Sequence, residues 1–242
     1  RLRNCVASGR TAVELATNPI RPRDILTQPA FENALKVLVA LGGSTNAIVH
    51  LLAIARRAGV SLTMNDLQKA SDAIPLLVDC KPSGSVYMED FHKSGGLPVL
   101  LKALESVLDP EPINIEGRSV RERIKDVEPP GDWQSVIRTL DAPLGNTGSL
   151  TTLSGSLAPD GAIIKTSAAS PELFEHEGPA VVFDSPEDAA ERLDDPGTEI
   201  TANHIMILRN AGPIAAGMPE AGSLPIPKHL AIQGVKDMVR VS

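Results

Sequence analysis

The chain changes its hydrophobic pattern once, near its middle, and this change limits the possible folds more than any other feature. Residues 1–108 carry apolar side chains at helical spacing, interrupted by glycine and proline. From residue 136 onward the apolar residues form short β-branched runs between turn residues. Residues 109–135, which separate the two patterns, are polar and rich in proline. We therefore predict an α/β chain with two domains, residues 1–125 and 126–242.

Capping and helix-breaking residues bound the expected helices. Ser44 or Thr45 caps one helix, Gly59 ends it, and Ser185 with Pro186 begins another. The helices are predicted at residues 6–17, 29–41, 46–58, 64–78, 86–94, 98–108 and 185–193. Apolar residues surround most of the helix at 46–58, so we expect it to be central and buried. The first domain is therefore predicted to end in helices, and the second to be mainly β.

Composition and charge exclude two classes of partner. Aromatic residues make up 2% of the chain and the net charge is −7, without a basic stripe, so we expect no nucleic-acid partner. No apolar run reaches transmembrane length, so we expect no membrane span. Cys5 and Cys80 lie in unrelated settings, and two reduced thiols in an intracellular protein are favoured over a disulfide.

The first residues, "RLRNCVASGR", lack an initiating methionine and have the pattern of the middle of a helix. We expect the chain to be an internal piece of a longer protein. The compartment is expected to be the cytoplasm, or an organelle if the source is eukaryotic.

The segment "LGGSTNAIVHL" (41–51) is a candidate anion site. A Gly-Gly turn leads into a helix, and Ser44, Thr45 and Asn46 lie at its beginning. Free N–H groups and the helix dipole favour an anion there, and these side chains could add donors to a carboxylate or phosphate. The alternative is a plain helix cap after a tight turn, and the residues alone slightly favour it.

Two further groups of residues leave alternatives open. Glu89 and His92 have i, i+3 spacing and could share a metal ion near Lys81 and Asp90, but a solvated short helix is favoured. Lys165 lies on a predicted strand, where it is either an outward, solvated residue or a buried one with a partner.

The segment "NAGPIAAGMPEAG" (210–222) surrounds one carboxylate, Glu220, with Gly, Pro and Ala. Glycines permit close approach of the backbone, so such a loop could hold the carboxylate in a fixed position. A hard cation such as Mg²⁺ takes one or two protein carboxylates and completes its shell with water and substrate. The alternative, a surface loop with a solvated glutamate, is narrowly favoured when this segment is taken alone.

Five segments together resemble the dihydroxy-acid and phosphogluconate dehydratase family, and they occur in the family's order. They are "IRPRDILTQPAFENALKVLVALGGSTNAIVHLLAIARRAGV", "KPSGSVYMEDFHKSGGLPVLLKAL", "GSLTTLSGSLAPDGAIIKTSA", "GPAVVFDSPEDA" and "LRNAGPIAAGMPEAGSLPIP". The last segment, with the "GVKDMVRVS" that comes after it, is more similar to the sugar-acid branch, whose members dehydrate aldonic acids such as pentonates.

The resemblance implies a [2Fe–2S] cluster and a Mg²⁺ ion held partly by a carbamylated lysine. The family's cluster cysteines and that lysine lie upstream of this segment, and Cys5 and Cys80 do not fall in the cluster motifs. The glutamate of "GMPE", Glu220, matches a family metal ligand. The family's catalytic serine would follow just beyond Ser242, so we assign no catalytic residue within this chain and expect the fragment alone to be inactive.

In the family reaction, Mg²⁺ orients the substrate, the cluster iron acts as a Lewis acid on the departing C3 hydroxyl, and the serine removes the C2 proton. The resemblance also implies that the second domain is a swivelling, β-barrel-like domain, here truncated at its end. We expect a homo-oligomer, either a dimer or a dimer of dimers, that acts on a small-molecule acid.

The resulting hypothesis is an iron–sulfur- and Mg²⁺-dependent hydro-lyase that converts an aldonate to a 2-keto-3-deoxy acid. The alternative within the class is dihydroxy-acid dehydratase of branched-chain amino-acid biosynthesis. An alternative of another class is a non-catalytic fragment or pseudoenzyme that acts only in binding or dimerisation. Cluster cysteines upstream and the serine motif downstream would distinguish an enzyme from the last alternative.

Overall fold

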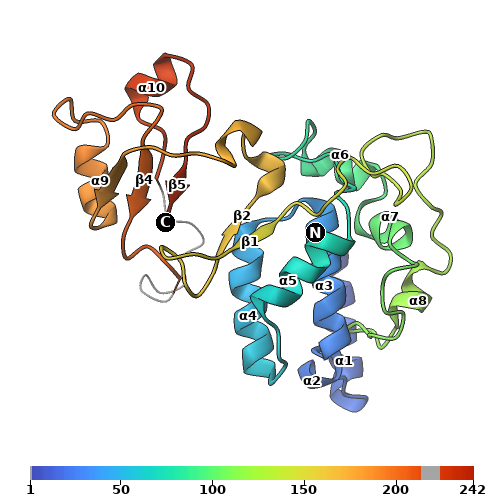
Figure 1. The fold of residues 1–242 in the computed structure, drawn as a ribbon. Helices are drawn as coiled ribbons and strands as arrows, with labels where there is room; N and C mark the ends of the chain where they lie inside the picture. Colours follow the sequence, from blue (N-terminus) through green and yellow to red (C-terminus); the bar gives the residue numbers. More distant parts are fainter. Residues whose placement is uncertain (1, 214–223) are drawn as a thin grey trace. The chain divides into compact units, whose positions relative to one another are not determined.

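The computed structural model describes residues 2–213 and 224–242, and the chain forms two compact units (Figure 1). Unit 1 is Arg1–Ala168 and unit 2 is Ala169–Ser242. The described part of the chain mixes helices with short strands, as the α/β pattern predicts.

Unit 1 is mainly helical. Its helices are α1 (Leu2–Thr17), α2 (Pro22–Ile25), α3 (Gln28–Leu41), α4 (Thr45–Ala58), α5 (Met64–Ala73), α6 (Met88–Lys93), α7 (Gly96–Ala103) and α8 (Val120–Ile124). A hairpin of β1 (Thr151–Leu153) and β2 (Ala162–Ile164) comes next, and a 3₁₀ turn at Thr166–Ala168 ends the unit.

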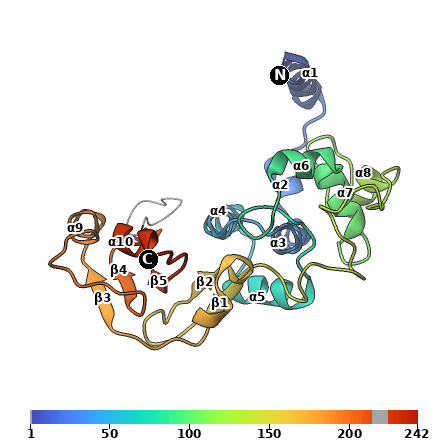
Figure 2. The same ribbon diagram turned by 90° about the horizontal axis from the view of Figure 1, so that it is seen from above.

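Helix α3 is the centre of the unit 1 core. Phe31, Leu35 and Val39 recur at intervals of four residues and are buried on one face of the helix. The helix contacts α4, α5 and α7. Figure 2 shows α3 and α4 nearly end-on, with α5 beside them. The core therefore forms around α3 and not around α4.

The expectation that the helix at 46–58 is central and buried is wrong for the described residues. Helix α4 buries only Ile48 and Ala55, and Ile54 is 44% exposed. Its wide apolar surface finds too few neighbours in unit 1 to cover it.

Capping residues and helix-ending glycines in the sequence predicted most helix ends correctly. Ser44 caps α4, Gly59 ends it in the left-handed conformation, and Ser185 caps a helix in unit 2. The helix predicted at 64–78 instead ends at Ala73, because Pro75 excludes the α conformation at the residue before it. The β-rich segment at 135–140 forms no strand and makes one isolated bridge, between Val78 and Ile137.

The segment after the linker packs onto the helices of unit 1. Strand β1 pairs antiparallel with β2 and contacts α5. The side chain of Gln68 on α5 accepts hydrogen bonds from the amide and the hydroxyl of Thr152, each at 2.8 Å. The compact units therefore divide at residue 168, later than the domain boundary expected near residue 125, and that boundary stays a prediction.

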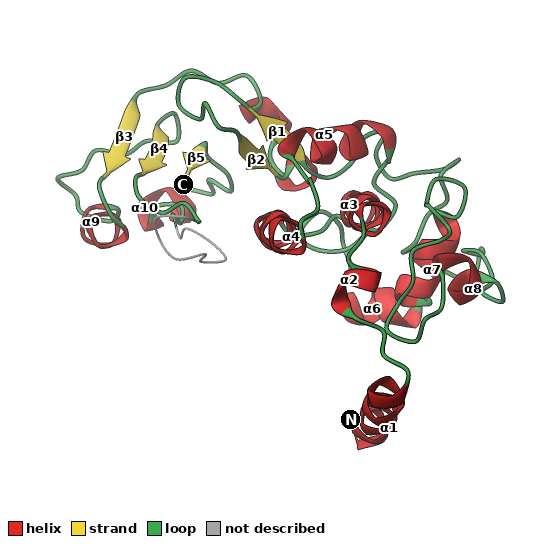
Figure 3. Cartoon of the chain, turned by 90° about the horizontal axis from the view of Figure 1, so that it is seen from below, coloured by secondary structure: helices red, strands yellow, loops and turns green. Residues whose placement is uncertain are grey.

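Unit 2 contains a small parallel sheet in the order β3-β4-β5, shown as yellow arrows in Figure 3. Its elements are a 3₁₀ turn (Pro171–Leu173), β3 (Ala180–Phe183), α9 (Pro186–Arg192), β4 (Ile205–Leu208), α10 (Lys228–Ile232) and β5 (Arg240–Val241). Phe183 and Met206 are fully buried in its core. Within the described residues the strands form no closed barrel, because each is two to four residues long and β3 and β5 remain open edges.

In the described ranges, no helix combines the length and the apolar character that crossing a membrane requires.

Candidate functional site

The turn between α3 and α4 depends on its two glycines. Gly42 ends α3 with φ of 71°, and its N–H donates to the carbonyls of Leu38 and Val39. The N–H of Gly43 donates to Leu38 O at 2.9 Å, and a Cβ at Gly43 would lie 2.1 Å from Leu38 Cδ1. The chain can therefore reverse between the two helices without a side chain at either position.

Helix α4 begins where the sequence predicts an anion site. Ser44 is its N-cap, and the Ser44 Oγ accepts a hydrogen bond from the amide of Asn46 at 3.2 Å. Thr45 and Asn46 occupy the first turn and are half-buried. The backbone amides of Ser44 and Thr45 donate to no other group among the described residues. We call Ser44, Thr45 and Asn46, together with the free amides of Ser44 and Thr45, the α4 mouth.

Lys165 comes directly after β2 and binds the Gly-Gly turn. Its Nζ donates to the carbonyl of Gly42 at 2.5 Å and to that of Gly43 at 3.0 Å. The question that the sequence left open is therefore answered: Lys165 is a half-buried lysine with backbone partners, not an outward, solvated residue.

The charge of Lys165 is not neutralised by a described acidic group. Burial lowers the pKa of its ammonium group, and the one described titratable neighbour that influences this pKa is Cys80, which raises it. Burial, with Asp79 nearby, raises the pKa of that thiol above its ordinary value of 9.0. Cys80 is therefore an uncharged thiol at neutral pH, and Lys165 supplies a net positive charge behind the turn.

Two serines connect the loop that carries Ser83 to the region of Lys165 and the Gly-Gly turn. Ser83 Oγ lies 2.7 Å from Ser167 Oγ, and Ser167 Oγ also donates to the carbonyl of Ser149 at 3.3 Å. Ser83 also flanks the turn, because a Cβ at Gly42 would lie 3.4 Å from Ser83 Oγ. Sequence reasoning did not single out either serine, since no local motif indicates that residues 84 positions apart will meet.

The segment at 79–98 forms the solvated short helix that the sequence favoured. Glu89 on α6 pairs with Lys93 at 2.9 Å, and both side chains are largely exposed. Asp90 Oδ2 accepts a hydrogen bond from the Tyr87 amide at 3.0 Å, as a helix-capping residue does. Neither carboxylate joins His92 in a metal-binding group within the described residues.

The described residues do not test the metal groups that the resemblance implies, because the ligands expected for them lie upstream of the chain or at Glu220. Nowhere in residues 2–213 and 224–242 do three His, Cys, Asp or Glu side chains come together as metal ligands. Cys5 is exposed and Cys80 is buried, and both are free thiols. Glu220, the predicted metal ligand, lies outside the described residues. The described side chains therefore support no step of chemistry through a cluster or a metal ion.

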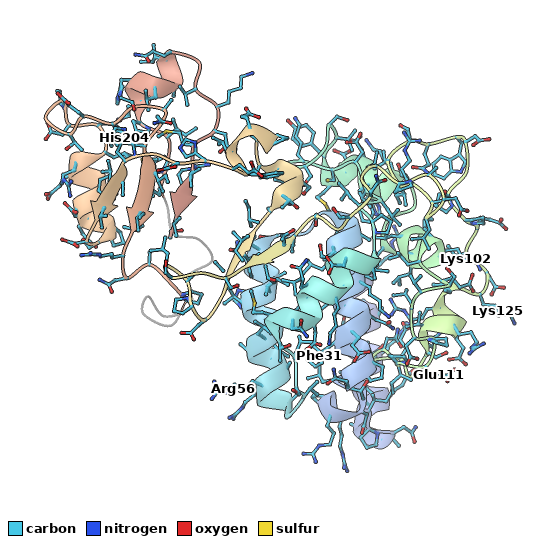
Figure 4. All side chains as sticks on the ribbon, viewed as in Figure 1. Phe31, Arg56, Lys102, Glu111, Lys125 and His204 are labelled. Carbon is cyan, nitrogen blue, oxygen red and sulfur yellow. The ribbon has the colours of Figure 1, made fainter. Side chains whose placement is uncertain are left out.

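A hollow of about 530 Å³ lies at the other end of α4, lined by Leu52, Arg56 and residues 59–64 (Figure 4 labels Arg56). Its lining carries one charged side chain, Arg56, and no carboxylate. The mouth residues are not among its lining residues, so this hollow is a feature separate from the predicted anion site.

Comparison with known proteins agrees with these motifs. A family model described as dihydroxy-acid/6-phosphogluconate dehydratase N-terminal matches residues 1–123, and the corresponding C-terminal model matches residues 135–242. The chain belongs to the dihydroxy-acid/6-phosphogluconate dehydratase family.

Relatives named for sugar acids match almost the whole chain. A 6-deoxy-6-sulfo-D-gluconate dehydratase of Pseudomonas putida is 45% identical over 97% of this chain and 41% of the relative. An L-arabonate dehydratase of Azospirillum brasilense is 44% identical over the same shares. A dihydroxy-acid dehydratase of Renibacterium salmoninarum is 43% identical over 85% of this chain and 36% of the relative. The chain thus spans about two fifths of the length of these curated relatives.

Proposed function

We propose that the protein containing this chain is a sugar-acid dehydratase. Loss of the C2 proton and the C3 hydroxyl from an aldonate gives an enol, which becomes a 2-keto-3-deoxy acid. The family match supports the dehydration reaction. One observation supports the choice of substrate class: the relatives named for sugar acids align with 97% of the chain, whereas the dihydroxy-acid dehydratase aligns with 85%.

In this proposal the α4 mouth binds the substrate carboxylate. The free amides of Ser44 and Thr45 point out of a helix N-terminus, where the dipole favours an anion. The Thr45 hydroxyl and the Asn46 side chain add donors for a carboxylate or a neighbouring hydroxyl. Because unit 1 fixes these groups before substrate arrives, the mouth holds the acid in one orientation while the proton and the hydroxyl leave.

The proposed full-length enzyme uses a [2Fe–2S] cluster and Mg²⁺, with Glu220 as one metal ligand and the catalytic serine beyond Ser242. The fragment alone is then inactive, and the second domain is the swivelling, barrel-like domain of the family. Glu220→Gln removes the charge and keeps the shape, so activity should fall by orders of magnitude and Mg²⁺ affinity should fall with it. Near-normal turnover with normal Mg²⁺ dependence would remove Glu220 from the site.

The proposed partners are small-molecule acids and further copies of the same chain, as a dimer or a dimer of dimers, in the cytoplasm. The similarity to a dihydroxy-acid dehydratase supports a second candidate substrate for the same class of enzyme, 2,3-dihydroxy-isovalerate. The experiment that separates them assays the full-length protein against L-arabinonate, D-gluconate, 6-deoxy-6-sulfo-D-gluconate and 2,3-dihydroxy-isovalerate. The highest kcat/KM is expected for one of the three aldonates.

The role of the mouth is tested by Thr45→Ala in the same protein. This change removes one hydroxyl donor and leaves the Ser44 cap in place, so KM for the preferred aldonate should rise about tenfold. If kcat and KM both remain at wild-type values, the plain-cap interpretation holds and the mouth does not bind substrate.

A further inference from the structure

Lys165 holds the Gly42–Gly43 turn from the side opposite its amides. In a planar trans peptide the C=O and the N–H point in opposite directions. Because the ammonium group binds the carbonyls of Gly42 and Gly43, the amides of Gly43 and Ser44 point away from it. The Gly43 amide is used by Leu38 O, and the Ser44 amide donates to no described group. Lys165 therefore fixes the direction of a free donor at the α4 mouth.

Lys165 keeps its positive charge unpaired because its partners are backbone carbonyls. A lysine paired with a carboxylate would form a neutral pair, whereas backbone carbonyls carry no net charge. Among the described groups that influence the pKa of Lys165 there is no carboxylate, and Cys80 is an uncharged thiol at neutral pH. The positive charge thus lies one peptide unit behind the mouth, on a half-buried side chain that water screens less than it screens a fully exposed one.

The first turn of α4 also lacks an acidic residue. In α2, α5, α6, α8 and α9, by contrast, a first-turn Asp or Glu accepts a hydrogen bond from a backbone amide at the start of the helix. Those helix N-termini are neutralised by the chain's own carboxylates. The α4 mouth combines an unused N-terminus with a lysine behind it, so it can take an external anion.

We propose that Lys165 is a positioning residue that sets the affinity of the α4 mouth for the carboxylate of the acid substrate. It acts in two ways: it fixes the turn that presents the free amides, and its charge polarises those amides toward an anion. Lys165 itself is bound to the turn and influences the substrate through it. The inference rests on the proposed function, because it takes the mouth as the carboxylate site.

The test replaces Lys165 in the full-length protein and measures both catalysis and binding. Lys165→Met removes the donors and the charge, and Lys165→Gln retains an amide donor without charge. Lys165→Arg retains the charge and can still donate to two carbonyls. The ligand is the aldonate with the highest kcat/KM among L-arabinonate, D-gluconate and 6-deoxy-6-sulfo-D-gluconate. Its dissociation constant is measured by calorimetry, and KM and kcat are measured separately.

Lys36→Met provides a matched control. Lys36 on α3 also donates to a backbone carbonyl, that of Val107 at 2.9 Å, in the same unit and away from the mouth. Both methionine variants should lose a similar amount of thermal stability. Only Lys165→Met is expected to raise KM and the dissociation constant, by about tenfold, with a smaller change in kcat. Lys165→Gln should fall between Met and wild type, and Lys165→Arg should remain within about threefold of wild type.

The results also separate this inference from the proposed function. If Lys165→Met and Lys36→Met leave aldonate binding equally unchanged while Thr45→Ala weakens it, Lys165 has only a structural role and the inference is overturned alone. If Thr45→Ala and the Lys165 variants all leave binding unchanged, or if the wild type binds none of the three aldonates, both proposals fail. Should Lys165→Met not fold, the Lys165→Gln and Lys165→Arg pair decides, since loss of binding in Gln with rescue in Arg supports the role of the charge.

Discussion

Helices α4 and α9 begin with the same kind of cap and differ in the residues of the first turn. Each has a serine N-cap whose hydroxyl accepts a hydrogen bond from a first-turn amide, at 3.2 Å in both helices. In α9, Pro186 removes one amide, and Glu187 and Asp188 bring two carboxylates to the first turn. In α4 the first turn has no acidic residue, and the ammonium group of Lys165 binds the preceding turn. A serine cap thus begins both helices. The N-terminus of α9 is neutralised by its own carboxylates, whereas the N-terminus of α4 remains open for an anion.

Giving α4 the carboxylate that α9 already has should produce the largest effect. Ala47 is three residues after the Ser44 cap, so Ala47→Glu creates a capping box like those of α5 and α8. The new carboxylate would occupy the mouth and repel an acid substrate, and we expect KM of the full-length enzyme to rise about a hundredfold. Unit 1 should at the same time keep or slightly gain thermal stability.

Ala47→Gln is the control for this change, because glutamine also completes a capping box but carries no charge. We expect its KM to stay within a few-fold of wild type. Equal KM values for the Glu and Gln variants would show that charge at the mouth has no influence on the substrate.

Removing the two serine caps compares the helices directly. Ser44→Ala and Ser185→Ala should each reduce the free energy of unfolding of their own unit by about 1 kcal/mol. The first should also raise KM severalfold, since it loosens the turn that carries the free amides, whereas the second should leave KM unchanged. Calorimetric unfolding and steady-state kinetics of both variants give the answer. An increase in KM for Ser185→Ala would contradict the assignment of the anion site to α4.

The smallest effect concerns acid stability, at the self-neutralised terminus of α5. Hydrogen bonds from Thr63 lower the pKa of Asp66 below its ordinary value of 3.8. The folded state then binds fewer protons than the unfolded state near that pH. The contribution is therefore fully present above pH 3.8 and is lost as pH falls through the lower pKa of the folded state. For Asp66→Asn we expect the free energy of unfolding at pH 7 to fall by less than about 1 kcal/mol. Because the variant has no carboxylate to protonate at this cap, its stability should then fall less on acidification than that of the wild type.

Denaturant unfolding at several pH values measures this difference. Asp72→Asn is a suitable control, because Asp72 lies on the same helix and accepts a hydrogen bond from the Gln68 side chain instead of from a helix cap. An acid dependence of Asp66→Asn that equals that of the wild type would show that the cap does not titrate as described.

The predictable parts of the molecule are those set by neighbours in sequence. The caps at Ser44 and Ser185 and the glycine stop at Gly59 depend on residues within one turn, and the structure confirms them. The helix at 64–78 was predicted too long because its apolar spacing outweighed the effect of Pro75 on the residue before it. Burial of α4 was predicted wrongly because periodicity reveals an apolar surface but does not show whether another element covers it.

The candidate site also has one part that local sequence predicts and one part that it does not. Ser44, Thr45 and Asn46 were predicted as a helix N-terminus from local sequence, and the structure places them there. The partner of Lys165 was not predictable, because 122 and 123 residues separate it from Gly43 and Gly42. The contact between Ser83 and Ser167, which lie 84 residues apart, was not predictable for the same reason. Such contacts depend on how the hairpin packs on the helices, which no local pattern encodes.

The hydrogen bonds of Lys165 also have a consequence for how segments of relatives can be exchanged. The turn lies in the part of the chain matched by the N-terminal family model, and Lys165 lies in the part matched by the C-terminal model. A chimera joined in the linker near residue 130 would take the two halves of this contact from different parents. One joined after residue 168, where the compact units divide, would inherit both halves from one parent. Chimeras of the second kind should keep the turn intact even when the donor of unit 2 has another residue where this chain has Lys165.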